Sequence, residues 1–307
     1  MSEVGQALDG SGIEKVGGWI KKTHHDIHAG TDPRNVTLPQ PYVVCIVGAS
    51  RGIGAGIARA YTQAGASGLV LASRRVSGLE ETAEECKKIN AKAEFKVISC
   101  DITSPQSVED LASQTKAAFG RLDALIINSG AAGGNYGVKL ADVPAEEIVN
   151  VTNVNYTGSF LCVKYFIPLL LATKDGAKAI VGINSYAALM VRGPFLMPAY
   201  SGSKAAQLRL LELAHEQYHA DGLNTYSVHP GAVPTDLALG TNFPKEFNGL
   251  LKDSTDLAGG FSVWLTKDRK QEWLSGRFAS AEWDVEELSG KKSEVVEKDL
   301  LKLTMDV

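Results

Sequence analysis

The stretch Tyr42-Val43-Val44-Cys45-Ile46-Val47-Gly48-Ala49-Ser50-Arg51-Gly52-Ile53-Gly54 indicates the fold of this chain. Its first six residues are apolar and rich in β-branched side chains, which predicts a buried strand of a parallel sheet. The glycines at 48, 52 and 54 allow a tight turn, a close approach to a pyrophosphate, and close packing of the next helix. Their spacing is GxxxGxG, and an amphipathic segment follows at 57–63. This order favours a nucleotide site over an ordinary strand-to-helix turn.

Strands and helices alternate along most of the chain. Such alternation predicts an α/β fold, a doubly wound parallel sheet of the Rossmann type in a single domain. Helices then cover both faces of the sheet, and ligands bind at the carboxyl ends of the strands. We expect further strands at 69–72, 94–99, 124–128, 179–184 and 224–229, and helices at 77–90, 107–119, 153–171 and 200–220.

The ends of the chain stand outside this alternation. We place the Rossmann-type domain at 42–285, an N-terminal extension at 1–41 and a C-terminal tail at 286–307. The extension contains paired glycines and several prolines, and we expect an accessory arm with a short helix at 13–22. Its function is not legible from the sequence.

Three histidines lie in this arm. His24 and His28 are spaced i, i+4, next to His25, and two imidazoles at this spacing could chelate zinc. A catalytic zinc site usually has three protein ligands and supporting hydrogen bonds. Nothing nearby in the sequence completes such a site, so we predict a solvated helix end and no metal.

Composition and charge exclude several classes of function. The net charge is -4, and no block is rich in Lys or Arg, which argues against nucleic acid as a partner. We find no apolar run long enough to cross a bilayer, and neither a signal peptide nor a peroxisomal tripeptide is recognisable, so we expect no membrane contact. Scattered cysteines without metal-like spacing predict reduced, structural thiols and a cytoplasmic protein. They are Cys45, Cys86, Cys100 and Cys162.

The end of the second predicted strand indicates which cofactor binds. A glycine loop of this kind is usually followed, about 20 residues on, by an acid for the ribose 2′-hydroxyl. Here the sequence is Ser73-Arg74-Arg75. Guanidinium groups bind phosphate through charge-assisted hydrogen bonds, so Arg74 and Arg75 predict NADP(H), and Arg51 could add a third. The alternative is a solvated strand end.

Tyr200 and Lys204 lie one helical turn apart in Tyr200-Ser201-Gly202-Ser203-Lys204. A free phenol titrates near pH ~10, and a neighbouring ammonium favours the phenolate. The pair therefore predicts a tuned proton donor, although the same spacing also occurs by chance on solvated helices.

Together these motifs resemble the short-chain dehydrogenase/reductase family over roughly residues 42–285. The ending at 276–284 is similar to that of fungal members of the family. The likeness is carried by an ordered set: Gly48 to Gly54, Asp101, Asn128-Ser129-Gly130, Asn155, Ser185, Tyr200, Lys204, and Pro230-Gly231 followed by Thr235.

The resemblance implies a catalytic tetrad of Asn155, Ser185, Tyr200 and Lys204. Tyr200 would act as general acid and base, and Ser185 would donate a hydrogen bond to the substrate oxygen. Lys204 would lower the Tyr200 pKa and bind the ribose, and Asn155 would hold a water that relays protons to Lys204. The residue-level alternatives are a helix cap for Asn155 and a simple strand-end hydroxyl for Ser185.

The resemblance also implies a set of cofactor-binding residues. Asp101 and Ile102 would flank the adenine, and 128–130 would line the adenosine side. Val233 and Thr235 would hold the carboxamide or the pyrophosphate. The full predicted set is Gly48, Ser50, Arg51, Gly52, Ile53, Gly54, Ser73, Arg74, Arg75, Asp101, Ile102, Asn128, Ser129, Gly130, Tyr200, Lys204, Pro230, Gly231, Val233 and Thr235.

Two departures from the family pattern matter. Ser129 stands where the family usually has alanine, and we expect the turn to survive. The connection from Ser185 to Tyr200 is longer than is common, which either displaces the serine or enlarges the loop; Ser203 offers no substitute because it belongs to the Tyr200 helix.

The segments that border the substrate in this family are mostly apolar here, so we expect an aromatic or alicyclic ketone, such as a secondary-metabolite intermediate. Core or subunit packing is the alternative. Phe243-Pro244 also suggests a lid. The apolar residues are Leu189, Met190, Val191, Phe195, Leu196, Met197, Leu237, Leu239, Phe243, Phe247, Leu250 and Leu251.

Three functions remain compatible with these residues. The first is an NADPH-dependent oxidoreductase that interconverts a ketone and a secondary alcohol on a small apolar molecule. The second is a non-redox enzyme, such as an epimerase, dehydratase or cyclase, and the third is a nucleotide-binding sensor. On family grounds we expect a homodimer or homotetramer that forms through the predicted helices at 153–171 and 200–220.

Overall fold

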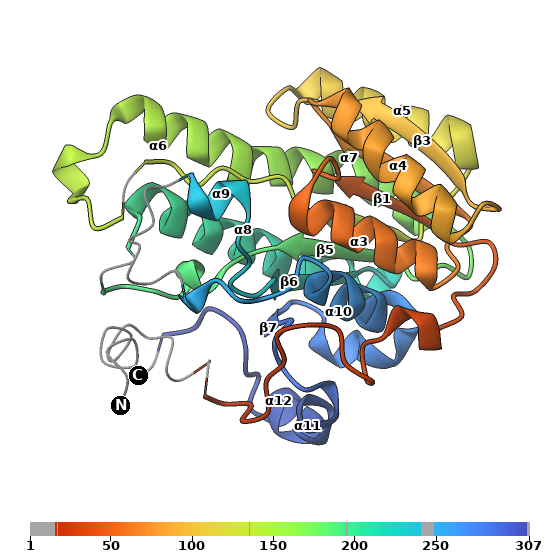
Figure 1. Ribbon diagram of the computed structural model, residues 1–307. Coiled ribbons are helices and arrows are strands. Elements are labelled where there is room, and N and C mark those ends of the chain that lie inside the picture. The colour runs from red at the N-terminus through yellow and green to blue at the C-terminus, as the bar shows by residue number, and fades with distance from the viewer. Residues whose placement is uncertain (1–15, 17, 135, 194–195, 241–248, 306–307) are drawn as a thin grey trace.

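A seven-stranded parallel sheet organises the chain, in the order β3-β2-β1-β4-β5-β6-β7 (Figure 1). The computed structural model describes residues 16, 18–134, 136–193, 196–240 and 249–305. The expected strands are confirmed, and β7 is an addition. The strands are β1 Val43–Val47, β2 Gly68–Ser73, β3 Glu94–Ser99, β4 Ala124–Ile127, β5 Ala179–Ile183, β6 Asn224–His229 and β7 Arg277–Ser280.

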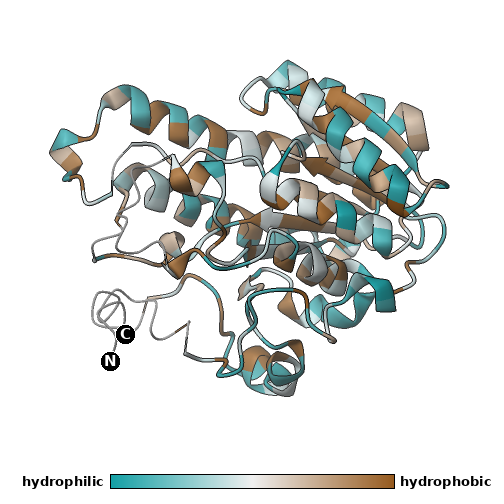
Figure 2. Cartoon of the chain, viewed as in Figure 1, coloured by the Kyte–Doolittle hydropathy of each residue, from teal (hydrophilic) through white to brown (hydrophobic). Residues whose placement is uncertain are grey.

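Successive side chains of β1 point to opposite faces of the sheet, and each face has its own core. Val44 and Ile46 join the core formed with α3, α4 and α10, whereas Val43, Cys45 and Val47 join the core formed with α5, α7 and α8. Figure 2 shows apolar strands between helices whose outer sides are polar. The helices are α3 Gly52–Gln63, α4 Val76–Ile89, α5 Pro105–Phe119, α6 Ala145–Thr152, α7 Gly158–Ala172, α8 Pro198–Tyr218, α9 Asp236–Leu239, α10 Leu257–Thr266, α11 Val285–Gly290 and α12 Lys292–Glu297.

The chain therefore forms a single doubly wound domain. Strand order reverses between β1 and β4, and in such sheets ligands bind at the carboxyl ends of the strands beside this point.

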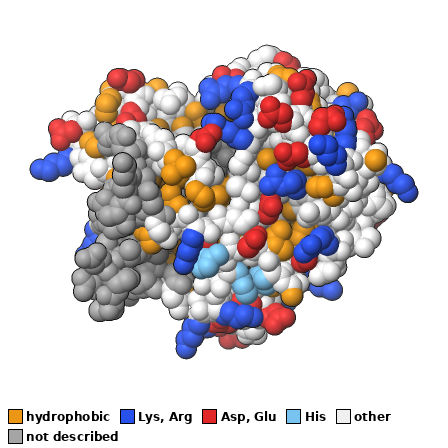
Figure 3. Space-filling view, in the orientation of Figure 1, with side chains coloured by type: hydrophobic (Ala, Val, Ile, Leu, Met, Phe, Trp, Pro, Cys, Tyr) orange, Lys and Arg blue, Asp and Glu red, His pale blue; other side chains and the backbone are white. Residues whose placement is uncertain are grey.

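The cysteines at 45, 86, 100 and 162 are free and buried. On the face seen in Figure 3, acidic and basic side chains are intermixed.

One helix is longer than the sequence suggested. A π-helical turn at Asn153–Thr157 joins α6 to α7, so residues 145–172 form a continuous helix. This 28-residue helix is long and apolar enough to cross a membrane, so the expectation that no apolar run would suffice was wrong. In this fold, however, 56% of its most apolar window is buried, as in the core helix of a globular protein.

The described part of the N-terminal extension packs against the domain. Ile20 and Leu38 are buried in the same core as β1, and Thr23 forms an antiparallel bridge with Trp283. Figure 1 shows the arm running beside α11. A helix was expected at 13–22. Val16 is helical, but residues 18–20 form a turn and a bend and 21–22 are irregular, so the helix does not reach 22; the other residues before 18 lie outside the described residues.

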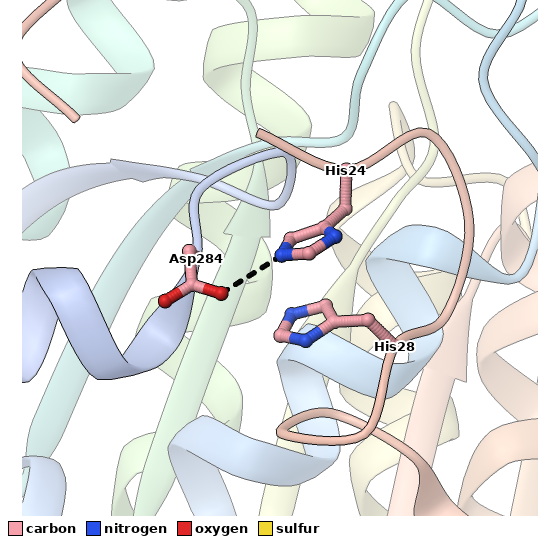
Figure 4. A group of neighbouring side chains, drawn as sticks. All are labelled: His24, His28 and Asp284. Carbon is pink, nitrogen blue, oxygen red and sulfur yellow. Dashed lines mark hydrogen bonds and ion pairs between the residues drawn. The ribbon is translucent and has the colours of Figure 1, made fainter. Parts of the chain in front are cut away.

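The arm's histidines also differ from the expected solvated helix end, because His25 lies in a bend and His24 and His28 lie in irregular segments. Figure 4 shows His24 and His28. The His24 ring stacks on His28, with 3.7 Å between centroids, and its Nε2 lies 2.9 Å from Asp284 Oδ2. The Gly30 N–H donates to His28 Nδ1, which places the proton of a neutral ring on Nε2. Lys22 also contacts Asp284, at 2.8 Å, so this carboxylate already has two basic partners.

Gly54 is required by the contact between α3 and the loop after β1. A Cβ at this position would overlap the carbonyl oxygen of Gly48 and lie 2.7 Å from Asn128 Nδ2. Gly202 in α8 is a matched control, because a Cβ there meets nothing within 4 Å.

We predict that Gly54→Ala lowers the free energy of unfolding by roughly 3 kcal/mol, because overpacking a close backbone contact forces a shift. Gly202→Ala should raise it by about 0.5–1 kcal/mol, since alanine is the better helix former. Urea unfolding of both variants measures these values. Equal stability of Gly54→Ala and the unchanged protein would contradict the packing argument.

Candidate active site

A cleft of about 450 Å³ runs along the carboxyl edge of the sheet. Its two ends are formed by different strands: β2 and β3 lie on one side of the β1–β4 junction, and β5 and β6 lie on the other. Arg74 and Asp101 therefore line one end, whereas Tyr200, Lys204 and Pro230 line the other. An elongated ligand can occupy the whole cleft.

Most of the predicted site residues line this cleft. Those that do not are Gly54, Asn155, Ser185, Gly231 and Val233. The sequence analysis missed several lining residues, most of which are neighbours of predicted ones at the strand ends. They are Cys100, Val154, Ile183, Asn184, Pro234, Asp236 and Thr255. Leu237, which was expected to border the substrate, also lines the cleft.

The glycine loop is held against the strand end after β4. Asn128 Nδ2 donates to the Gly48 carbonyl at 2.8 Å, and a Cβ at Gly48, where φ is +97°, would lie 2.7 Å from the Ser129 nitrogen. The side chain of Arg51 makes no cap hydrogen bond at the start of α3. The first backbone N–H groups of α3 can therefore bind an anion, such as the diphosphate of a dinucleotide.

The three arginines that line the cleft have different partners. Arg75 Nη2 donates to the Ser50 carbonyl at 3.2 Å, and Arg74 lies close enough to Asp101 to influence its pKa. Arg51, which could have been a third phosphate ligand, instead forms an ion pair with Asp236. Arg74 and Arg75 thus remain as the basic groups at the β2 end.

Asp101 is oriented for hydrogen bonding. Its Oδ1 accepts from the Thr103 N–H at 2.9 Å and from the Thr103 hydroxyl at 2.7 Å. The N–H bond first, and then the hydroxyl, lower the pKa of Asp101. The carboxylate is therefore ionised, and its second oxygen can serve a ligand.

Ser185 lies beside Tyr200 despite the long connection between them. Burial raises the pKa of Tyr200 to about 12, and a hydrogen bond with Ser185 opposes this rise. Part of the connection forms a short 3-10 helix, Tyr186–Ala188 (η4). The extra residues therefore enlarge the loop and do not displace the serine.

Lys204 is directed toward the backbone after β5. Its Nζ donates to the Ile183 carbonyl at 2.7 Å and to Gln207 Oε1 at 3.1 Å, and it lies 5.9 Å from the centroid of the Tyr200 ring. Burial lowers the pKa of Lys204 to about 7.

The expectation that Lys204 lowers the Tyr200 pKa is wrong for this structure. Both groups are buried, and burial disfavours the charged form of each. The phenol is therefore held as a neutral acid beside an amine that can gain or lose a proton near neutral pH.

Asn155 fixes the backbone around the site. It is fully buried in the π-helical turn, and its Oδ1 accepts from the Ala131 N–H at 2.8 Å. Its Nδ2 donates to the Ala131 carbonyl at 2.8 Å and to Ser203 Oγ at 2.9 Å. The side chain is thus no helix cap, and it joins the π-helical turn to α8 and to the loop after β4. The water-holding function stays a prediction.

Two residues that interact with the predicted catalytic residues were missed. The Tyr136 phenol lies close enough to Tyr200 to raise its pKa, and no pattern in the sequence marks this loop residue. Gln207 binds Lys204 through its oxygen and Ser159 Oγ through its Nε2, at 2.8 Å. Its position three residues after Lys204 on the same helix was an available signal.

Comparison with known proteins agrees with this geometry. A family profile described as short chain dehydrogenase matches residues 42–243. The chain is 36% identical over 298 residues to short chain dehydrogenase pgmD of Aspergillus terreus, covering 94% of each protein. It is 37% identical over 290 residues to short chain dehydrogenase mpl6 of Monascus purpureus, covering 94% of this chain and 96% of that protein.

Solved structures show the same fold. A 7 alpha-hydroxysteroid dehydrogenase complexed with NADH and 7-oxo glycochenodeoxycholic acid superposes with a TM-score of 0.71 at 22% identity, covering 83% of this chain and 97% of that one. The RhlG/NADP complex of Pseudomonas aeruginosa gives 0.70 at 22% identity, with the same coverage. The chain belongs to the short-chain dehydrogenase family, which is a family of oxidoreductases.

The buried amine of Lys204 predicts a pH dependence of stability. Its pKa is about 7 in the folded protein, against 10.5 for an unperturbed lysine. Between these values the unfolded chain holds the proton more strongly, so the free energy of unfolding rises with pH.

We expect the unchanged protein to gain about 2 kcal/mol between pH ~7 and ~9 relative to Lys204→Met, which lacks the titrating group. Urea unfolding at several pH values measures this difference. Lys164→Met, at an exposed position of α7, serves as the control and should follow the unchanged protein. Parallel pH profiles for Lys204→Met and the unchanged protein would show that Lys204 keeps its ordinary pKa.

Proposed function

We propose that this protein is an NADP(H)-dependent oxidoreductase that interconverts a ketone and a secondary alcohol on a largely apolar small molecule. The observation that carries the proposal is the placement of Tyr200 beside Ser185, in a cleft that also contains the glycine loop and, at its opposite end, Arg74. A nonpolar carbonyl substrate and a dinucleotide would meet at the Tyr200 end. The ligands named for the two solved structures support this arrangement. One structure contains NADH with 7-oxo glycochenodeoxycholic acid, and the other contains NADP.

The residues of the chain suit acid–base chemistry. A bound nicotinamide cofactor supplies or accepts the hydride. Tyr200 donates a proton to the carbonyl oxygen during reduction, and Ser185 donates a hydrogen bond to the same oxygen. Lys204, with a pKa of about 7, lies one turn along α8 and can return a proton toward Tyr200. Asn155 keeps the backbone of Ala131 and the side chain of Ser203 in place.

The apolar surroundings favour an aromatic or alicyclic ketone, such as a secondary-metabolite intermediate. Leu237 lines the cleft, and Met190 and Met197 are buried in the loop before α8. Val191 and Leu239, by contrast, are exposed. The remaining aromatic residues on which the expectation rested, and the suggested lid, lie outside the described residues: Phe195, Phe243, Pro244 and Phe247.

The proposal includes a cytoplasmic homo-oligomer that forms through α7 and α8. Phe160 on α7 is 46% exposed and Leu213 on α8 is 51% exposed. Large apolar side chains at such positions suit contact with a second copy of the chain.

The function of Tyr200 is tested by Tyr200→Phe. We expect NADPH binding to persist and turnover to fall roughly 10²- to 10⁴-fold, because the ring remains and the proton donor is lost. Loss of NADPH absorbance with a panel of cyclic, aromatic and aliphatic ketones measures turnover. Tyr165→Phe, on α7 and outside the cleft, is the control and should retain activity. Retained turnover in Tyr200→Phe would reject the assignment.

The preference for NADP(H) is tested by Arg75→Ala and Arg74→Ala. Each variant should weaken NADPH binding about tenfold or more, because a charge-assisted contact to the 2′-phosphate is lost. NADH lacks this phosphate, so its affinity should not change. Fluorescence titration with both cofactors measures the dissociation constants, and comparable affinity of the unchanged protein for NADH and NADPH would contradict the preference.

A further inference from the structure

Asp253 is a buried carboxylate that two distant parts of the chain bind. Its Oδ2 accepts from the Ala232 N–H at 2.5 Å, and its own N–H donates to the Ala232 carbonyl at 3.2 Å. Its Oδ1 lies 2.5 Å from His25 Nδ1 in the N-terminal arm. The Asp253 side chain is 1% exposed, whereas that of His25 is 45% exposed. The arm thus reaches a carboxylate that holds the turn after β6.

This turn forms part of the cleft wall. Pro230, Pro234 and Thr235 line the cleft between the Tyr200 end and the glycine loop, where a Cβ at Gly52 would lie 3.5 Å from Thr235 Cγ2. Gly231 has φ +97°, and a Cβ there would lie 2.7 Å from Asp253 Oδ2, so the carboxylate packs directly against the turn. A displacement of Asp253 would therefore move residues that border the cleft.

The segment that carries Asp253 reaches the cleft a second time. The Ser254 N–H donates to the His25 carbonyl at 2.8 Å, and the next residue, Thr255, lines the cleft. His25 therefore binds this segment through both its ring and its backbone. Two stretches of the cleft wall depend on one residue of the arm.

The charges explain why Asp253 needs a basic partner. Glu282 lies nearby, and burial first, then the charge of Asp253, raises the pKa of Glu282 to about 7. A buried carboxylate beside a second carboxyl group is costly unless a donor or cation compensates it. The contact with His25 Nδ1 provides that compensation on the side away from Ala232.

His24 offers a natural comparison. It precedes His25 in the arm and also contacts a buried carboxylate, Asp284, at 2.9 Å. Asp284 accepts from the N–H groups of Glu286 and Glu287 at the start of α11 and does not line the cleft. The two histidines thus make similar contacts in different places.

We infer that His25 is a positioning residue: through Asp253 it fixes the turn 230–235, and the N-terminal arm thereby determines how tightly the nicotinamide half of the cofactor is held. The inference rests on the proposed function in assigning the Tyr200 end of the cleft to the nicotinamide. The β2 end, with Arg74 and Asp101, is formed by other strands and does not depend on His25.

The test compares three variants with two ligands. His25→Phe keeps the ring and removes the donor, His25→Asn keeps a donor near the position of Nδ1, and His24→Phe is the matched control. NADPH occupies the whole cleft, whereas adenosine 2′,5′-bisphosphate carries only the adenosine and 2′-phosphate groups. Fluorescence or calorimetric titration gives each dissociation constant without turnover.

We expect His25→Phe to weaken NADPH binding about tenfold, which corresponds to the loss of one hydrogen bond to a charged group. Its affinity for adenosine 2′,5′-bisphosphate should not change. His25→Asn should restore NADPH binding to within about threefold of the unchanged protein. His24→Phe should bind both ligands normally while melting at a lower temperature.

Several outcomes would overturn the inference: normal NADPH binding by His25→Phe, an equal loss of both ligands, or an equal loss in His25→Phe and His25→Asn. If His25→Phe does not fold, His25→Ala takes its place. If neither folds, His25 is required for the fold itself and the inference fails. An unchanged protein that binds no NADPH would instead overturn the proposed function, and the inference with it; one that binds NADPH and reduces no ketone would overturn the proposed function alone.

Discussion

Close backbone packing around α3 is the constraint on which the rest of the structure depends. Gly54 brings the first turn of this helix onto the carbonyl of Gly48, and a Cβ at Gly56 would overlap the Thr255 carbonyl. A Cβ at Gly259 in α10 would lie 2.8 Å from the Gly56 oxygen. Because α3 is held by backbone on both sides, its uncapped N–H groups face the cleft at a fixed position. One short helix thus joins the glycine loop, the segment before α10 and the sheet.

Burial sets the chemistry at the other end of the cleft. It keeps the phenol of Tyr200 protonated and brings the pKa of Lys204 to about 7. In water near neutral pH the phenol is neutral and the amine is charged; inside the protein the phenol stays a proton donor and the amine becomes able to titrate. The Lys204 amine donates hydrogen bonds to the carbonyl of Ile183 and the side-chain oxygen of Gln207. Both acceptors are uncharged, so neither neutralises the charge of the protonated amine.

The sequence predicted the features that follow from local pattern. The alternation of strand-like and helix-like segments located the strands, including 94–99 and 224–229 with their observed bounds, and the glycine loop located the cleft. β7 was missed because Arg277–Ser280 is short and contains no apolar run; it is buried only through its place beside β6. The contact between His25 and Asp253 spans 228 positions, and no local signal encodes it. The direction of the Tyr200 pKa shift was misjudged, because the pairing of Tyr200 with Lys204 is visible in the sequence and the burial of both groups is not.

The ion pair between Arg51 and Asp236 joins the glycine loop to the start of α9 at the edge of the cleft. Both side chains are more than half exposed, so the pair contributes little to stability and is screened by salt. An incoming anionic group can replace the carboxylate as the partner of Arg51 at small cost. Arg51 can therefore change partners while the close backbone packing around α3 still holds the glycine loop.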